Sequence, residues 1–257
     1  MHFKLSLMLA VVTATTLCAQ GPETHAGGGP GDAALLRAEF GFANKVVTGA
    51  PYSAQAVTQF TQTLANGDHI QRTTTASVFR DSQGRMRTER SAAAMGSLSA
   101  TGARAIVIHD PVAGVSYALD PANKTARSMM IPAARNRPAG DHVARQSERA
   151  SASAKIEDLG TQVIQGVNAQ GKRVTRVIPA GRVGNEKDID IVTETWYSPD
   201  LQVVVMSKTS DPRFGDSVYQ LNSINRAEPD PTLFVVPSDY TVTQGPRFGR
   251  RGAARVY

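Results

Sequence analysis

The sequence predicts a β-dominated α+β domain built on a curved, open antiparallel sheet, a half-barrel of about ten strands with one or two short helices. Three observations lead to this fold class. Apolar and polar residues alternate with a period of two over much of the chain from Ser53 to Val242. Turn signals such as Asn66-Gly67 recur at short, regular spacing. The chain has 1 cysteine, so the core rather than disulfides has to hold the domain together.

Residues 1–19 have the features of a signal peptide. Lys4 supplies a positive charge, and the apolar stretch after it is shorter than the roughly 18 residues that span a membrane. Cleavage after Ala19 is expected, which predicts a periplasmic or secreted protein. Two alternatives stay open. One is a short buried helix, and the other is a lipoprotein anchored through Cys18, for which Leu17 is a poor fit as the preceding residue.

The segment after the signal peptide predicts a linker followed by a helix. Residues 20–31 are rich in glycine, as flexible linkers are. Asp32 suits the N-cap of a short helix in which Leu36 and Phe40 share one face. A single β-rich domain is expected over residues 32–244.

The first half of this domain divides into strands at clear turns. Strands are expected at residues 53–64, 70–79, 86–90, 105–108, 115–119 and 125–131. Asp110-Pro111 and Asp120-Pro121 start two of the turns, because aspartate accepts local backbone hydrogen bonds and proline fixes φ.

The second half predicts a further antiparallel series. Strands are expected at residues 161–167, 173–178, 189–197, 201–208 and 217–225, with residues 168–171 as a hairpin loop and an edge strand closing near Val242. Residues 133–155 lack an apolar period and predict a mobile basic loop. Residues 245–257 predict a disordered, arginine-rich tail.

The formal net charge of +6 is concentrated outside the expected strands. The tail contains Arg247, Arg250, Arg251 and Arg255 and no acidic residue. Such an arm predicts contact with anionic lipid headgroups or an envelope protein through Arg247, Arg250 and Arg251. A folded nucleic-acid-binding face is not indicated. Membrane contact is expected to be peripheral at most, since no later stretch is long and apolar enough to span a bilayer.

No set of residues in the sequence amounts to a catalytic or metal site. Residues 166–173 approach a P-loop, but Arg173 stands where Ser or Thr would hold Mg²⁺, and a strand-like pattern follows instead of a helix. His69, His109 and His142 fit no metal-ligand spacing. We predict no enzyme activity, no metal and no cofactor. A hydrolase whose triad is assembled only in three dimensions stays open.

Candidate ligand contacts are apolar residues of the strands. Val192, Glu194 and Trp196 lie at alternate positions of one strand and share a face. Residues 203–206 are apolar throughout, which predicts burial on both sides of that strand. Trp196 is interpreted either as a ligand contact on the concave side of the sheet or as a core anchor, and Glu194 as a cross-strand charge partner. The predicted ligand-binding set is Phe60, Val192, Trp196, Val204 and Met206.

Several stretches together resemble the LolA-like superfamily of outer-membrane-lipoprotein carrier and sorting proteins. The stretches are Ile108-His109-Asp110-Pro111, Tyr117-Ala118-Leu119-Asp120-Pro121, Glu194-Thr195-Trp196-Tyr197 and Leu233-Phe234-Val235-Val236-Pro237. The resemblance covers roughly residues 52–242 and implies an open β half-barrel whose concave face is plugged by helices. It also implies that the protein carries acyl chains or senses lipoproteins. The sequence has few helical segments to form such a plug.

Two functions follow as expectations. The first is an exported envelope binding module that holds a lipid or other apolar ligand on the concave face of the sheet. The second is a non-enzymatic interaction or regulatory protein of the cell envelope without a bound lipid, as in the sigma-factor-regulating branch of that superfamily. A lined apolar cavity would favour the first over the second.

Overall fold

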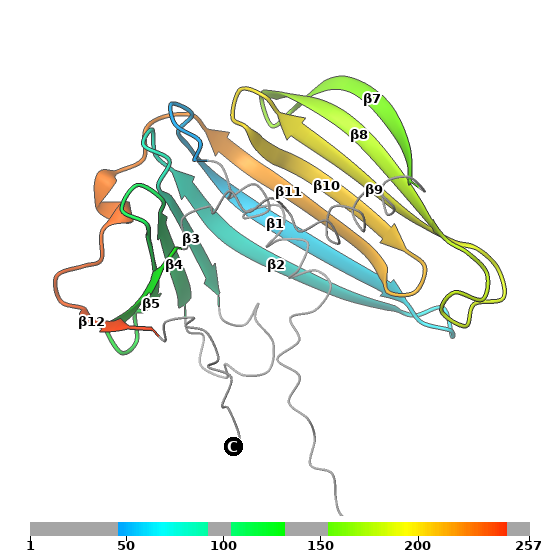
Figure 1. Cartoon of the computed structure of the whole chain (residues 1–257), viewed down its shortest axis with the longest axis horizontal. Helices are drawn as coiled ribbons and strands as arrows, with labels where there is room; N and C mark the ends of the chain where they lie inside the picture. The colour runs from blue at the N-terminus through cyan, green and yellow to red at the C-terminus, as the bar shows by residue number, and fades with distance from the viewer. Residues whose placement is uncertain (1–45, 92–103, 132–153, 246–257) are drawn as a thin grey trace, which may run out of the picture.

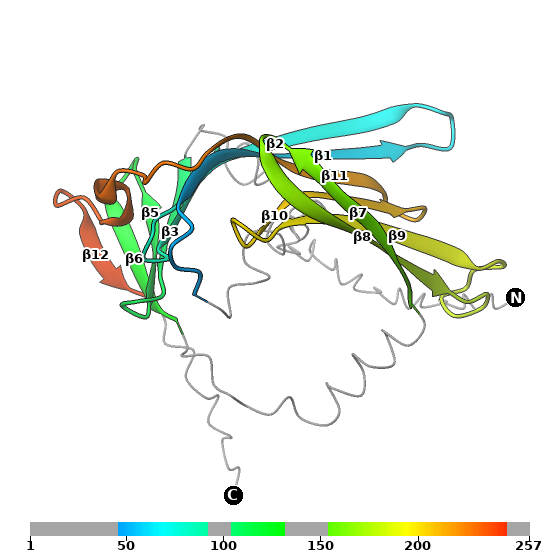
Figure 2. The ribbon, with the colours of Figure 1, turned by 90° about the horizontal axis from the view of Figure 1, so that it is seen from above.

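One twelve-stranded sheet accounts for nearly all of the residues that the computed structural model describes, namely 46–91, 104–131 and 154–245 (Figure 1). The sheet is strongly bent and its two edge strands do not pair with each other (Figure 2). The expected fold class, a curved and open antiparallel sheet, is therefore confirmed, with twelve strands in place of about ten.

The elements follow the alternating stretches of the sequence. They are β1 (Tyr52–Thr63), β2 (His69–Arg80), β3 (Met86–Ser91), β4 (Arg104–Asp110), β5 (Val115–Asp120), β6 (Thr125–Met130), β7 (Ala154–Ile164), β8 (Val167–Ile178), β9 (Ile189–Ser198), β10 (Val203–Asp211), β11 (Gly215–Asn225), the 3₁₀-helix η2 (Pro231–Phe234) and β12 (Thr241–Gln244). No helix in the described ranges is long and apolar enough to cross a membrane. The expected helix from Asp32, the signal peptide 1–19, the linker 20–31 and most of the basic loop and tail lie outside the described residues.

The strand order shows how the two halves of the chain are joined. Across the sheet the order is β12-β6-β5-β4-β3-β2-β1-β11-β10-β9-β8-β7. β1 to β6 form one antiparallel series and β7 to β11 another, and the β1–β11 pair connects them. β12 returns to the first series and pairs parallel with β6.

The aspartate-proline turns form by the expected mechanism. Asp110 Oδ1 accepts hydrogen bonds from the backbone nitrogens of Val112 and Ala113, at 3.0 and 2.8 Å. Asp120 Oδ1 does the same for Ala122 and Asn123, at 3.0 and 3.3 Å. Each carboxylate therefore fixes the connection between two successive strands.

The hairpin between β7 and β8 differs from the sequence prediction. The turn consists of Gln165 and Gly166, with φ of 50° and 79°, so both residues adopt the left-handed conformation of a type I′ turn. The expected loop at residues 168–171 lies within β8, and the basic loop predicted to extend to 155 ends before β7 begins at Ala154. The error arose because Gln is uncommon at such a turn, whereas the Asn-Ala-Gln-Gly sequence has weak strand propensity. The expected tail likewise begins one residue too early, since Gly245 donates a backbone hydrogen bond to Ser128 O at 2.8 Å.

The register assigns each strand residue to one of two faces, because directly opposed residues of antiparallel neighbours share a face. We call one the Tyr52 face, which carries Tyr52, Ala56 and Phe60 of β1. The opposite face, which we call the Trp196 face, carries Trp196. Trp196 pairs with Met206, Met206 pairs with Gln220, and Gln220 pairs with Val57, which lies on the side of β1 opposite Tyr52.

The packing of η2 identifies the inner face of the bend. Arg87 lies on the Trp196 face of β3, and its guanidinium donates to Leu233 O of η2 at 2.8 Å. Figure 2 shows η2 on the outside of the bend. The Tyr52 face of the neighbouring strands β1 to β3 therefore lines the inside.

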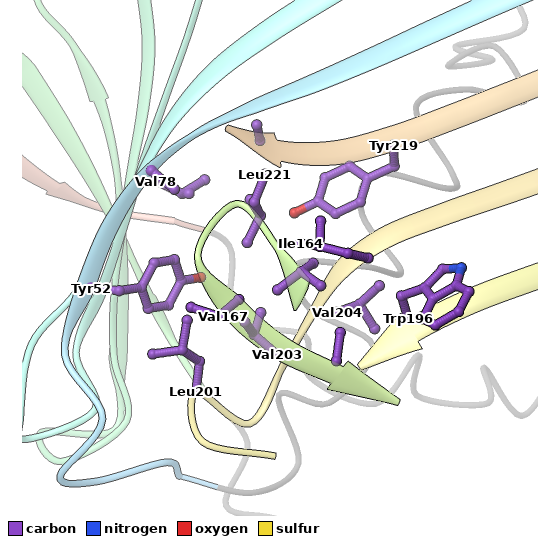
Figure 3. Packing of buried hydrophobic residues seen from close by; sticks show 14 of the residues in the cluster. Tyr52, Val78, Ile164, Val167, Trp196, Leu201, Val203, Val204, Tyr219 and Leu221 are labelled. Atoms are coloured by element: carbon purple, nitrogen blue, oxygen red, sulfur yellow. The ribbon is translucent and has the colours of Figure 1, made fainter. Parts of the chain in front are cut away.

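Two hydrophobic clusters stabilise the sheet, and the larger one includes Trp196 as well as residues of the Tyr52 face. The larger one contains Tyr52, Val78, Tyr219 and Leu221 and extends to Leu201 and to Ile164 and Val167 beside the β7–β8 turn (Figure 3). The smaller one, on the Trp196 face, consists of Ile106, Ile108, Leu119 and Ala126, against which Val236 and Tyr240 pack.

The start of β10 is buried on both sides, as the apolar run predicted. Val203, Val204 and Val205 are 7%, 3% and 0% exposed. A bulge interrupts the pairing between Val204 and Met206, so that Val204 opposes Tyr197 while Met206 opposes Trp196. The two predicted contacts of β10 therefore lie on opposite faces.

Candidate functional site

Along β1 and β2, the side chains on the inner face change from buried to exposed. On β1 the side chains of Tyr52, Ala56 and Thr58 are buried, whereas Phe60 is only half-buried. On β2 burial ends in the same way, and Ile70 is 41% exposed. The uncovered half therefore starts at the level of Phe60, which makes it the accessible part of this face.

A row of directly paired residues crosses the sheet at this level. We call it the Phe60 row, and it consists of Arg72, Phe60, Ser217, Thr209, Thr193, Val174 and Ile156, in order from β2 to β7. An exposed arginine stands at one end, three hydroxyls occupy the middle, and two aliphatic side chains form the other end. The row is thus amphipathic along its length.

Two buried hydroxyls flank Phe60 without a hydrogen-bond partner. Ser217 lies directly opposite Phe60, and Thr58 precedes Phe60 by two positions on the same face. Neither Thr58 Oγ1 nor Ser217 Oγ has a partner within the described part of the chain. Buried polar atoms are normally hydrogen-bonded, so this pair makes the level of Phe60 a candidate binding site. The neighbouring hydroxyls Thr193 Oγ1 and Thr209 Oγ1 contact each other at 3.5 Å.

A buried arginine closes the opposite, covered end of the inner face. Arg80 is 3% exposed, lies over the ring of Tyr52 at 4.7 Å, and donates from Nε and Nη2 to Ala50 O at 3.0 and 2.7 Å. Nη2 also donates to Leu201 O in the β9–β10 turn. Burial lowers the pKa of Arg80 from its ordinary value, but arginine keeps its charge. The guanidinium therefore holds the β9–β10 turn over the end of β2.

The register divides the five predicted ligand contacts between the two faces. Phe60 lies in the uncovered half of the inner face, and Val204 lies on the same face in the buried cluster. Val192, Trp196 and Met206 belong to the Trp196 face and do not join Phe60. The prediction placed all five residues together because the register between strands decides the face, and the alternation within a single strand does not reveal that register.

Trp196 packs against glycine across the strand pair. It is 8% exposed and directly opposes Gly171, where an added Cβ would lie 2.6 Å from two carbons of the indole ring. The ring thus covers the backbone of β8, and of the two interpretations of Trp196 this packing favours the core anchor. Glu194 is a cross-strand charge partner, as expected, because its Oε1 accepts from Arg173 Nη2 at 2.6 Å and from Nε at 2.9 Å.

The motifs weighed for nucleotide and metal binding can be located among the described residues. Residues 166–173 span a turn and the start of β8, with Arg173 bound to Glu194, so no helix opens there as a P-loop requires. In the described ranges no three His, Cys, Asp or Glu residues stand close enough to hold a metal ion. His142 and the tail residues Arg247, Arg250 and Arg251 lie outside these ranges.

The hydroxyl-bearing members of the site were missed by sequence reasoning. Thr58, Thr193, Thr209 and Ser217 each sit at an ordinary strand position and carry no motif. Only the pairing of four strands places them near one another. Alternation of Thr and Ser on the half-buried face was the available signal, and alone it does not distinguish a site from a solvated surface.

Comparison with known proteins gives structural similarity without sequence relatives. No family model matches the chain, and no curated protein matches it. Among solved structures it is similar to MucB, with 13% identity over 79% of this chain and a TM-score of 0.40, and it spans 63% of the length of MucB. It is also similar to a LolA superfamily protein from Nitrosomonas europaea, with 7% identity, coverage of 80% and 97% of the two chains, and a TM-score of 0.31. A third similarity is to the Mycobacterium tuberculosis lipoprotein LppX, with 12% identity, coverage of 77% and 96%, and a TM-score of 0.31.

One of these similar structures is described as a LolA superfamily protein. At these identities and TM-scores the function has to be derived from the residues of this chain.

Proposed function

We propose that this protein is a non-enzymatic binding module of the cell envelope whose inner sheet face holds an apolar ligand with an oxygen-bearing head group, such as a lipid. The observation that carries the proposal is the pair of buried, unpartnered hydroxyls of Thr58 and Ser217 on either side of Phe60. The aromatic ring would contact the apolar part of the ligand, and the hydroxyls would bind its ester, carboxyl or hydroxyl oxygens. Arg72 at the end of the row would favour an anionic head group.

The test uses a substitution that removes one hydroxyl and keeps the shape of the side chain. Thr58→Val should leave the fold at least as stable, because it removes an unsatisfied buried polar atom. The same change should weaken binding of a fluorescent fatty acid several-fold, and Phe60→Ala should weaken it further. Thr75→Val is the matched control, since Thr75 is an exposed threonine of β2 on the opposite face. Equal affinity of Thr58→Val and the native chain would refute the assignment of the site.

The envelope location is part of the proposal and rests on the features of residues 1–19. N-terminal sequencing of the exported protein should start at Gln20. A mature chain starting at a modified Cys18 would instead establish a lipoprotein.

A second candidate function, an interaction module, is favoured by the open edge of the sheet. β7 is the last strand of the order, and two apolar side chains on it, Ile156 and Val163, are 63% and 68% exposed. An extended segment of an envelope protein could pair with such an edge. One structure similar to this chain is described as MucB in complex with MucA(peri). Val163→Lys should abolish such a complex in envelope cross-linking, whereas Val235→Lys, at a comparably exposed valine outside the strands, should not.

A further inference from the structure

Three chain reversals lie together at one end of the sheet. They are the β1–β2 turn at residues 64–68, the β8–β9 loop at residues 179–188, and the β10–β11 turn at residues 212–214. Figures 1 and 2 both show these three reversals at the same end, and we call them the rim. The rim borders the uncovered half of the inner face, because Phe60 and Ser217 lie toward this end of β1 and β11.

Each reversal of the rim, or a strand end beside it, presents an exposed apolar side chain. Val183 in the β8–β9 loop is 58% exposed and Phe214 in the β10–β11 turn is 51% exposed. Leu64 and Ile70 at the β1–β2 turn and Val177 at the end of β8 are 38%, 41% and 39% exposed. Exposed apolar side chains also lie elsewhere, for example Val112, Met130 and Val163, but five of them lie on the turns and strand ends of the rim.

The backbone of the rim is largely satisfied by its own hydrogen bonds. Asn185 Nδ2 donates to Pro179 O and Lys187 O at 3.0 and 2.7 Å, and Asn185 Oδ1 accepts from Val183 N at 3.1 Å. Phe214 N donates to Asp211 O at 3.0 Å, and Leu64 N to Asp68 O at 2.8 Å. Turns closed in this way hold their apolar side chains outward and lose little hydrogen bonding when they leave water.

Most charges of the rim are balanced locally; the exception is Asp68 in the β1–β2 turn, whose carboxylate accepts from Asn66 Nδ2 at 2.7 Å. Arg213 binds Asp211 at 2.6 Å and lies over the ring of Phe214 at 4.9 Å. In the β8–β9 loop Arg182 and Lys187 are offset by Glu186 and Asp188, and Asp188 Oδ1 accepts from Ala180 N at 2.8 Å. The rim therefore has no net positive charge that would select an anionic surface.

From these observations we infer that the rim docks on a lipid bilayer by inserting Val183, Phe214 and Leu64 into the interface of zwitterionic lipids. The three side chains lie on separate turns. A lipid surface suits them because it is deformable, so each side chain can insert to a different depth. The largely balanced charges and closed turns keep the cost of leaving water low. The rim differs in this from the arginine-rich tail, whose attraction would depend on anionic lipid. This docking does not require a ligand at the Phe60 row.

The experiment measures the depth of single positions on vesicles that contain only zwitterionic lipid. Cysteine is introduced at Val183 or Phe214 of the exported chain, which has no other cysteine after cleavage behind Ala19, and is labelled with an environment-sensitive dye. Val235→Cys is the matched control, since Val235 is 57% exposed and is not part of the rim. On phosphatidylcholine–phosphatidylethanolamine vesicles, emission at 183 and 214 should shift to the blue, and emission at 235 should not.

A second arm measures partitioning without a label. The double variant Val183→Ser and Phe214→Ser should lower the vesicle partition coefficient about tenfold or more, because it removes two apolar side chains from the interface. Val235→Ser should leave the coefficient unchanged, and all three proteins should melt at the same temperature. The inference is overturned if the dye at 183 stays in a water-like environment. It is also overturned if Val235→Ser lowers partitioning equally, or if the chain binds only after anionic phosphatidylglycerol is added. Fatty-acid binding by the double variant tests the Phe60 row independently, because neither substituted residue belongs to that row.

Discussion

At the scale of single residues, the contact between Trp196 and Gly171 is a tight constraint on the sheet. The indole lies across the glycine so closely that any side chain there would overlap ring carbons. An aromatic ring on a cross-strand glycine shields backbone that glycine leaves exposed, and so offsets the low strand propensity of glycine. This contact accounts for Gly171 within β8, where the sequence alone favoured a turn.

Gly171→Ala is expected to destabilise the fold by about 2 kcal/mol, because the ring has to move and no flexible atom can give way. The loss is measured by urea denaturation, and the emission of Trp196 reports the displacement directly, since it is the single tryptophan of the chain. Combining Gly171→Ala with Trp196→Phe should recover part of the loss relative to the sum of the two single changes. Strict additivity of the two changes would argue against the contact.

His109 couples the stability of the sheet to pH. Its pKa is lowered from the ordinary value because burial disfavours the charged imidazolium, and the attraction of Asp110 opposes this only in part. Below the unfolded-state pKa of about 6.5, the unfolded chain binds protons that the folded chain does not. Stability contributed by neutral His109 is therefore fully present above that pH and is lost as pH falls toward the folded-state pKa.

His109→Gln should flatten this dependence. The difference in melting temperature between pH 7.5 and pH 5 is expected to be smaller in the variant than in the native chain. If His109→Gln melts with the native pH dependence, His109 does not carry the coupling.

At the scale of elements, η2 is a single helical turn that packs against β3 and β4. Phe234 is 4% exposed and lies beneath the guanidinium of Arg85, at 5.3 Å from ring to charge. Asp230 caps η2 by accepting from Thr232 N at 2.9 Å. A single turn of helix is too short to be stable alone, so its position depends on this buried ring.

Phe234→Ala is therefore expected to cost about 3 to 4 kcal/mol of unfolding free energy. The neighbouring Val235→Ala should cost less than about 0.5 kcal/mol, because Val235 is largely exposed. Chemical denaturation of the two variants measures both losses of unfolding free energy. Similar midpoints for both would mean that the buried ring of Phe234 does not anchor η2.

The same scale shows what the sequence could and could not predict. Local patterns placed most strands and the aspartate-proline turns, because period and turn chemistry act within a few residues. The valine run of β10 also predicted burial on both sides. The β7–β8 turn was misplaced because a Gln-Gly pair adopts a turn more often formed by Asn-Gly.

The candidate site could not be predicted for a different reason. Phe60 was identified as an apolar strand residue, but its partners Ser217 and Thr209 are far away in the sequence and meet it only through pairing with β11 and β10. Trp196 and Met206 were assigned to the ligand because each strand was considered alone. Register, which decides the face, is a property of pairs of strands.

At the scale of the whole molecule, the basic tail and the folded sheet are expected to act independently. Removing residues 246–257 keeps Gly245 and its hydrogen bond to Ser128 O. The free energy of unfolding should then change by less than about 0.5 kcal/mol. Binding to anionic vesicles, which Arg247, Arg250 and Arg251 are expected to support, should decrease and lose its dependence on salt. A clear fall in melting temperature would show that the tail packs on the sheet.

If the chain is exported, as proposed, the pairing of β1 with β11 bears on the order in which its strands form. A chain that crosses a membrane N-terminus first delivers β1 to β6 early, and each of these strands except β1 finds its antiparallel neighbours close by in sequence. The edge of β1 that pairs with β11, where Phe60 lies opposite Ser217, stays unpaired until almost the whole chain has emerged. Long-range pairing of this kind is slow, and an unpaired edge can recruit other chains in the meantime. A nascent chain stalled before β11 would therefore be the form most prone to aggregate, and the form on which a holding chaperone would have the greatest effect.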